Sequence, residues 1–463
     1  MALGLEGTPL PQLNRIAVGL TFGLLVASLL GLLLDALPCI KKARKANSYP
    51  RPWVLIMLVC SYALLIPALW AILFSFNIGS FGASMKASTD SMLEFIDTLG
   101  TTGSWWGAAL VTLFSIAIPI MKIVLLICGE CYRHSEDPRK VMFARRSILF
   151  VRAISKWACP DMMAYIFLLY LVRSLNHPDT LEGLFKLDVG FTCYTLFCVG
   201  STVSSLGVHV PTLPESTEKV VAPRTSRNGS AALLTMFTAG FVACLTVGLI
   251  FPCMALRLDI QALVHNNPLV DESMIPFLID TLHLPDLAKA EVTIPRCIGM
   301  LSQTQSDAFD ANAILAIVML AVFVVGFTVF DMIALIVAAF QSLRLDGTCT
   351  VEDATAVRHK ALAASSTLKK LSMLDVTILG IVIVVASGTV YKQQGLILSF
   401  RPGLLGMLGA EICHYATYFF VHNLPTAQNL QKNQRVKDTM DTEIGNSMDE
   451  DVVNENVVPR ATE

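Results

Sequence analysis

Residues 118–126 read IPIMKIVLL, which places a proline and a lysine inside an apolar run that begins near Trp106 and ends at Cys128. A helix needs about 20 apolar residues to cross the hydrocarbon core of a bilayer, and this run is long enough. A charge at the bilayer centre costs about 2.5–3.5 kcal/mol on insertion scales, so such residues usually face a bundle interior or a cavity. The stretch therefore predicts a transmembrane helix with one polar, irregular side.

The composition of the whole chain is that of a multi-pass, all-α integral membrane protein. Of the 463 residues, 54% are hydrophobic and only 15% are charged, whereas about 25% of the residues in soluble domains are charged. No basic region is interleaved with aromatic residues, so nucleic acid is not an expected partner. Nine apolar runs predict about nine transmembrane helices: 16–38, 53–76, 105–128, 158–174, 186–207, 231–256, 312–340, 373–391 and 402–421.

The charge of the loops predicts the orientation of these helices. Loop 77–104 carries three acidic residues against one lysine, and four other loops are basic: 41–52, 129–157, 208–230 and 341–372. Basic loops stay in the cytoplasm, so nine spans place the amino terminus outside and the carboxyl terminus inside. We expect the first span to be retained rather than cleaved, because its basic residues follow the apolar run.

Four sequence blocks recur in the same order, which predicts an internal repeat. Residues 155–172 align with 369–386, 64–70 with 248–256, 91–99 with 273–282, and 116–127 with 326–337. In this alignment Pro67 falls on Pro252, Asp161 on Asp375 and Lys122 on Asp331. We therefore expect an extra helix and basic loop (1–49), two parallel four-helix units (50–229 and 230–428), an outside insertion at 283–310, and a disordered acidic cytoplasmic tail (429–463).

The order and duplication of these motifs resemble the paraquat-inducible protein A family. The motifs are a span with proline near its outer end, a span with Pro-x-x-Lys, a basic loop, and an aspartate where the next span begins. The last is KWACPDMM at 156–163 and KLSMLDVT at 370–377. The resemblance covers roughly residues 50–425. It implies a role in lipid movement beside MCE-domain proteins, which form hydrophobic conduits between membranes, with this chain loading or receiving phospholipid.

The sequence departs from that family where the relatives carry paired zinc ribbons before each unit. A zinc site needs four ligands. Loops 41–52 and 208–230 contain no cysteine or histidine except His209, and the one CxxC motif, Cys128 to Cys131, has no second pair. We therefore expect no metal and no other cofactor.

Two charged residues at equivalent positions are the strongest candidates for a site. Lys122 lies one turn from Pro119, which frees a backbone carbonyl, although its long stem also allows snorkelling towards the cytoplasm. Asp331 has no such stem, and Thr328 shares its helix face. We expect these residues either to form an ion pair or to line a polar pocket between the two units, where Lys122 would hold a lipid phosphate.

Asp161 and Asp375 allow two interpretations. Each lies in the first turn of a helix, where the helix dipole favours a carboxylate, and each would also lie near a cytoplasmic opening. The full set of candidate substrate-binding residues is Lys122, Asp331, Pro119, Thr328, Asp161, Asp375, Trp157, Pro67 and Pro252.

Three functions fit these observations. There is no GxSxG, Walker or HExxH motif, so we expect no enzyme. The first interpretation is a lipid-transport component, favoured by a cavity that opens sideways to the membrane. The second is an ion- or proton-coupled small-solute transporter, favoured by a closed site at the midplane. The third is a tetraspan-like scaffold without substrate, favoured by a packed Lys122–Asp331 pair.

Overall fold

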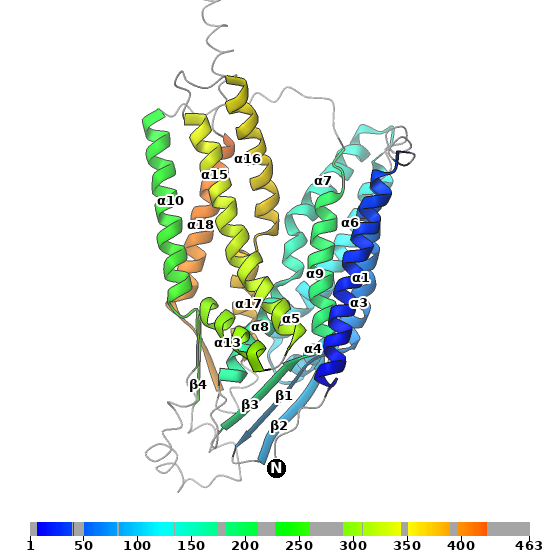
Figure 1. Ribbon diagram of the computed structural model, residues 1–463, viewed down its shortest axis with the longest axis vertical. Helices are drawn as coiled ribbons and strands as arrows, with labels where there is room; N and C mark the ends of the chain where they lie inside the picture. Colours follow the sequence, from blue (N-terminus) through cyan, green and yellow to red (C-terminus); the bar gives the residue numbers. More distant parts are fainter. Residues whose placement is uncertain are drawn as a thin grey trace, which may run out of the picture.

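The computed structural model is mostly helical and describes residues 7–38, 40, 51–80, 83–133, 135–174, 181–211, 227–258, 290–307, 309–343, 351–388 and 396–423 (Figure 1). The predicted tail 429–463, the repeat block 273–282 and most of loops 41–52 and 208–230 lie outside these residues. Within them, eight helical stretches are long and apolar enough to cross a membrane: Leu10–Ala36, Pro52–Trp70, Trp105–Tyr132, Val189–Gly207, Gly229–Ile250, Ala311–Ser342, Ala356–Ser387 and Pro402–Asn423. The predicted multi-pass helical class is confirmed.

The structure has eight such stretches rather than nine because the predicted span 158–174 is a short helix. This helix, α8 (Pro160–Ser174), has 15 residues, which gives about 22 Å of length against a hydrocarbon core of about 30 Å. It follows α7 (Pro138–Ile154) after a 3₁₀ turn, η2 (Ser155–Ala158). Together α7, η2 and α8 form one broken helical segment.

The second unit has a comparable break. The predicted span 373–391 is α17 (Leu374–Ser387), which follows α16 (Val351–Leu371) after a break at residues 372–373. Discontinuous helices of this kind leave backbone groups that side chains or ligands can satisfy inside a membrane protein. Both breaks fall within the aligned blocks that contain Asp161 and Asp375.

The helices form two groups that diverge at one end of the molecule (Figure 1). The first group contains α1 (Leu10–Ala36), α3 (Pro52–Trp70), α6 (Ile118–Tyr132), α7 and α9 (Val189–Gly207). The second contains α10 (Arg227–Ile250), α15 (Phe327–Leu343), α16 and α18 (Pro402–Asn423). The short helices α8 and α17 pack against each other where the two groups meet.

The long helical stretches that end in α6 and α15 are irregular. In the first unit α5 (Trp105–Thr112) continues through a π-helical segment, η1 (Leu113–Ala117), into α6. In the second, α14 (Ala311–Val318) continues through the π-helical segment η5 (Met319–Gly326) into α15. Segments of this type frequently occur at functional sites. They end just before Pro119 and Thr328.

Two small antiparallel sheets, which the sequence analysis did not predict, lie at the same end of the molecule (Figure 1). The first has the order β2-β1-β3 and the second the order β5-β4-β6. Each central strand directly follows the first helix of its unit. The strands are β1 (Ile72–Ser80), β2 (Ala83–Ser91), β3 (Leu181–Leu187), β4 (Met254–Leu258), β5 (Ala290–Val292) and β6 (Leu396–Phe400).

The remaining described elements lie near these sheets. Helix α4 (Met92–Thr101) follows β2. The predicted insertion 283–310 contains β5 and the amphipathic helix α13 (Ile294–Asp307) rather than loop alone. The element order of the two units is similar, and the internal repeat itself stays a prediction from the sequence.

A glycine allows the close approach of α8 and α17. A Cβ on Gly380 would lie 2.8 Å from Met163 Cβ and 2.9 Å from the carbonyl oxygen of Pro160. Small residues let helix backbones approach closely where burial from water no longer drives their association. The contact of α8 with α17 therefore fixes how the two units meet, and it positions the groove described next.

Candidate functional site

A groove of about 530 Å³ lies between the two units. This volume is within the range of about 300–1,000 Å³ that is typical of ligand sites. Its walls are almost entirely apolar, and they include Leu113, Met121 and Phe150 from the first unit and Ile378, Leu379 and Leu408 from the second. Several of these side chains are partly exposed.

Three residues with polar groups line the groove, but they present no accessible polar surface to it. These residues are Trp157, Asp375 and Glu411. Asp375 Oδ2 lies 2.8 Å from the ammonium of Lys156 and accepts a longer bond of 3.4 Å from Trp157 Nε1. Asp375 also lies in the first turn of α17, as expected, where its Oδ1 accepts from the Val376 amide. Asp375 therefore hydrogen-bonds the start of α17 and also lines the groove.

Lys156 connects the first unit to the break in the second. Besides Asp375, its ammonium donates to the carbonyl oxygens of Ser372 (3.2 Å) and Lys369 (3.4 Å). The residue is 5% exposed and its charge is almost fully enclosed by these partners. Because Lys156 lies in η2 and its partners lie at the end of α16 and the start of α17, both helix breaks meet at this ion pair.

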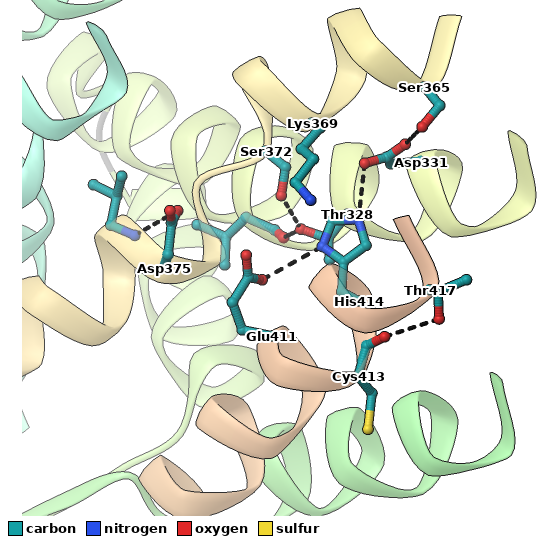
Figure 2. Close-up of polar contacts among 12 residues, drawn as sticks. Thr328, Asp331, Ser365, Lys369, Ser372, Asp375, Glu411, Cys413, His414 and Thr417 are labelled. Carbon is teal, nitrogen blue, oxygen red and sulfur yellow. Dashed lines mark hydrogen bonds and ion pairs between the residues drawn. The ribbon is translucent and has the colours of Figure 1, made fainter. Parts of the chain in front are cut away.

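A second polar network lies inside the second unit (Figure 2). Asp331 accepts from Ser365 Oγ at 2.5 Å and bonds His414 Nε2 at 2.8 Å. The other ring nitrogen, His414 Nδ1, lies 3.5 Å from Glu411 Oε2. All four residues are buried. Since Glu411 lines the groove, the series of contacts runs from Asp331 through the imidazole to the groove.

Thr328 links this network to the helix break. Its hydroxyl lies 2.6 Å from Ser372 Oγ, and it also donates to the carbonyl of Val324 (Figure 2). Nearby, the ammonium of Lys369 lies 3.6 Å from the ring centre of Tyr415 and 3.7 Å from that of Tyr418. Cations are attracted to such ring faces.

Lys122 is buried in the first unit, and the structure does not place it at the groove. It is 0% exposed, and its ammonium donates to Ser155 Oγ (2.6 Å), the Ser201 carbonyl (2.8 Å) and Ser201 Oγ (3.1 Å). Snorkelling is therefore wrong, and so is the expected meeting of Lys122 with Asp331. The reason is rotational: each residue faces inward within its own unit, towards the helices that follow it, rather than across the interface.

Asp161 is a buried carboxylate without a cation. Its Oδ2 accepts from Ser115 and, at 3.4 Å, from Tyr194. Its Oδ1 has no hydrogen-bond partner among the described residues, and it lines a small cavity together with Ser387, whose hydroxyl is also unsatisfied there. Within the same part of the chain no basic side chain forms an ion pair with it. Its counterpart in the alignment, Asp375, is paired.

The three candidate prolines do not line the groove. The Pro119 carbonyl accepts from the Tyr62 hydroxyl at 3.0 Å. Pro67 lies in the last turn of α3, where its carbonyl accepts the amide of Ala71. Pro252 follows α10 and accepts from Gly403. These residues shape helix ends and contacts instead of binding a ligand.

Sequence reasoning missed Glu411 and His414 as site residues. They were treated as a weakness of the last predicted span. Two ionisable residues three positions apart share a helix face, and ionisable residues inside a span usually mark function, so the signal was present. Among the described residues, no group of three or more histidine, cysteine, aspartate or glutamate side chains is arranged to hold a metal ion.

Comparison with known proteins agrees with the resemblance in the sequence. Residues 52–209 match the family model described as Paraquat-inducible protein A. No curated protein and no solved structure matches the chain. The matched range runs from the start of α3 to just beyond α9. Residues 52–209, which fall within the predicted first unit, are therefore similar to the paraquat-inducible protein A family.

Proposed function

We propose that the protein is the integral membrane component of an intermembrane lipid-transport system and holds lipid in the groove between its two units. The observation that carries this proposal is the groove itself, with its apolar walls, which we expect to open towards the acyl chains of the membrane. An acyl chain would lie along these apolar walls. The role requires no covalent chemistry, so the proposed activity is transport and not catalysis.

The proposed orientation follows the charge of the loops. The sheets and the start of α1 lie at one end of the molecule, and the end of α18 lies at the other (Figure 1). By the positive-inside rule the basic loops are cytoplasmic, so the sheet end would face outward. An MCE-domain protein, the partner that the family resemblance suggests, would then meet the sheet end and exchange lipid there.

Matched tryptophan substitutions on α18 test the proposal. Leu408 lines the groove, whereas Leu405, on the same helix, is 71% exposed and does not line it. We expect Leu408→Trp to fill the groove and to reduce several-fold the phospholipid that co-purifies with the full-length protein, measured by mass spectrometry. Leu405→Trp should leave it unchanged. Equal lipid content in both variants and the wild type would contradict the proposal.

A second candidate function is ion- or proton-coupled transport, which the carboxylate of Asp161, unpaired among the residues that the structure describes, favours. Ionisable groups buried in a membrane protein commonly mark ion or proton pathways. Proteoliposomes that contain a pH-sensitive dye would test it under an imposed ion gradient. Proton movement that depends on the wild-type protein and is lost in Asp161→Asn would support this function, and proton movement equal to that of empty liposomes would exclude it.

A further inference from the structure

Helix α7 is strongly basic, although its carboxyl end lies at the groove. Its 17 residues include five basic side chains and no acidic one. Arg152 is half-buried and donates to the carbonyl oxygens of Leu206 and Val208. Arg139 and Arg146 are exposed instead, and neither forms an ion pair with another residue that the structure describes. Their charges are therefore available to a ligand.

Arg146 lies on the face of α7 that leads into the groove. Phe150 follows it by four positions and Ile154 by eight, so the three side chains share one helix face. Both Phe150 and Ile154 line the groove, and Phe150 is 49% exposed. The opposite face packs inside the first unit, where a Cβ on Gly129 of α6 would lie 2.8 Å from Ile148 Cγ1. Arg146 and the groove are thus joined along one side of α7.

The spacing along this face matches the length of a phospholipid. At 1.5 Å per residue, Arg146 is about 6 Å from Phe150 and about 12 Å from Ile154 along the helix axis. One leaflet contributes about 15 Å to a hydrocarbon core of about 30 Å. An acyl chain on the walls of the groove would therefore carry its phosphate to the level of Arg146. In the proposed orientation this end of α7 faces the cytoplasm, so the lipid would belong to the cytoplasmic leaflet.

The side chains beside Arg146 suit the boundary between headgroups and acyl chains. Phe143 precedes it by three positions and is 49% exposed, and Met142 is 40% exposed. A helix face that combines exposed apolar and basic side chains is typical of segments in the membrane interface. A guanidinium group binds phosphate oxygens through paired N–H donors. Anionic headgroups attract a basic side chain at the membrane surface by about 1 kcal/mol.

We propose that the groove prefers phospholipids with a net negative headgroup, and that Arg146, with Arg139 further along the same face, is the headgroup subsite. The inference rests on the proposed lipid function and specifies its substrate class: phosphatidylglycerol rather than phosphatidylcholine. The choline ammonium of phosphatidylcholine would meet the positive charge of α7, whereas the phosphate of phosphatidylglycerol has no cation of its own. Headgroup recognition thereby moves away from Lys122, whose ammonium is occupied by Ser155 and Ser201.

Native mass spectrometry of the full-length protein, titrated with phosphatidylglycerol and phosphatidylcholine of identical acyl chains, tests this inference. We expect the wild type to retain phosphatidylglycerol about fivefold above phosphatidylcholine, a difference of about 1 kcal/mol. Arg146→Gln removes the charge and should bring that ratio close to one. Arg146→Lys keeps the charge without the paired donors and should preserve more of the preference than Arg146→Gln.

Arg145 provides the matched control. It is the neighbouring residue of α7, so Arg145→Gln removes the same charge at nearly the same depth. Its side chain is half-buried and projects about 100° away from that of Arg146 around the helix axis. We expect Arg145→Gln to leave the ratio of the wild type almost unchanged. Equal losses in Arg145→Gln and Arg146→Gln would overturn the inference, because the preference would then come from the overall charge of α7.

The outcomes also separate this inference from the function on which it rests. Equal retention of the two lipids by the wild type would overturn the headgroup preference and leave the lipid role intact. Retention of both lipids by Leu408→Trp at the level of the wild type would overturn the lipid role itself. If Arg146→Gln does not fold, the wild-type ratio and Arg139→Gln, which changes an exposed residue on the same face, still decide the question.

Discussion

Lys156 of the first unit and Asp375 of the second form an ion pair of 2.8 Å across the interface between the units. In the alignment of the two units, Asp375 corresponds to Asp161, which has no cation among the described residues. The two aligned aspartates therefore have different surroundings. One joins the units beside the groove, and the other remains a buried carboxylate in the neighbouring cavity.

Removing one partner of the Lys156–Asp375 pair should destabilise the protein strongly. A buried charge that loses its partner typically costs about 3–5 kcal/mol, whereas replacing both partners costs far less. We expect Lys156→Met and Asp375→Asn each to lower the free energy of unfolding by about 3 kcal/mol, and the double variant to lower it by less than the sum. Thermal or denaturant unfolding in detergent micelles measures this double-mutant cycle.

The local ion pair between Glu130 and Arg133, at 3.4 Å on α6, provides the control. Pairs at this spacing contribute about 0.2–0.5 kcal/mol, so Arg133→Met should have little effect. Additive losses in the Lys156 and Asp375 cycle would show that the pair does not couple the units.

The sequence predicted most of the helices because a membrane permits so few alternatives. Every backbone polar group must be satisfied inside the bilayer, so a long apolar run almost always forms a helix. The sheets were missed because their pairing is non-local. Strand β1 pairs with β3 more than 100 residues later, for example through Phe74 and Leu187, and neither segment alone indicates its partner. Helix α8 was expected to span because its sequence is apolar, although its length is not sufficient.

The candidate site was predicted only in part, for a geometric reason. Hydropathy gives the depth of a residue along a helix but not the direction in which its side chain points. Lys122 and Asp331 were expected at equal depth and assumed to face each other, yet each turns into its own unit. Asp375 and Trp157 do line the groove, because the helix break beside them lies at the interface. Glu411 and His414 were recognised only once the packing of α18 was known.

Lys122→Met should weaken the fold without removing bound lipid. The ammonium donates to Ser155 and Ser201, and hydrogen bonds to charged groups contribute about 1.5–3 kcal/mol each. We expect a loss of about 2 kcal/mol in the free energy of unfolding and an unchanged amount of co-purified phospholipid. Lipid mass spectrometry and unfolding on the same preparations measure both. Loss of a phospholipid class with stability preserved would instead make Lys122 a headgroup contact.

Gly380→Val should disturb the contact between the two units. An added side chain would meet Met163 and the Pro160 carbonyl at less than 3 Å, so α8 and α17 would have to move apart. Overpacking of this kind costs about 1–3 kcal/mol. Gly23→Val on α1 is a matched control, since nothing lies within 4 Å of its Cβ position. If the two variants unfold at the same temperature, the close approach does not set the position of the units.

The start of α4 should respond to acid. Ser91 and Glu94 form a capping box, in which the Ser91 amide donates to Glu94 Oε2 at 2.8 Å and the Glu94 amide donates to Ser91 Oγ. The hydrogen bond from the Ser91 amide, and then the bond with the Ser91 side chain, lower the pKa of Glu94 below its ordinary value of 4.5.

The sign of the effect follows from this direction. A carboxylate whose pKa is lower in the folded state stabilises the fold above its unfolded pKa, and the contribution is lost as the pH falls through the folded pKa. We expect the unfolding midpoint of the wild type to fall more steeply below about pH 4.5 than that of Glu94→Gln. Ser91→Ala should cost about 1 kcal/mol at neutral pH. Parallel curves for the wild type and Glu94→Gln would show that the capping box does not contribute.

Asp161→Asn should tolerate burial at least as well as the native carboxylate. The amide keeps the size of the side chain and an oxygen that accepts from Ser115 and Tyr194, while it removes a charge that is costly to bury without a partner. We expect an unchanged or higher free energy of unfolding. Asp161→Ala should instead lose about 1–3 kcal/mol, because the Ser115 hydroxyl loses its carboxylate acceptor. If Asp161→Asn lost as much stability as Asp161→Ala, the charge of the carboxylate itself would stabilise the fold. If Asp161→Asn is stable and also fails to move protons in liposomes, Asp161 serves transport rather than packing.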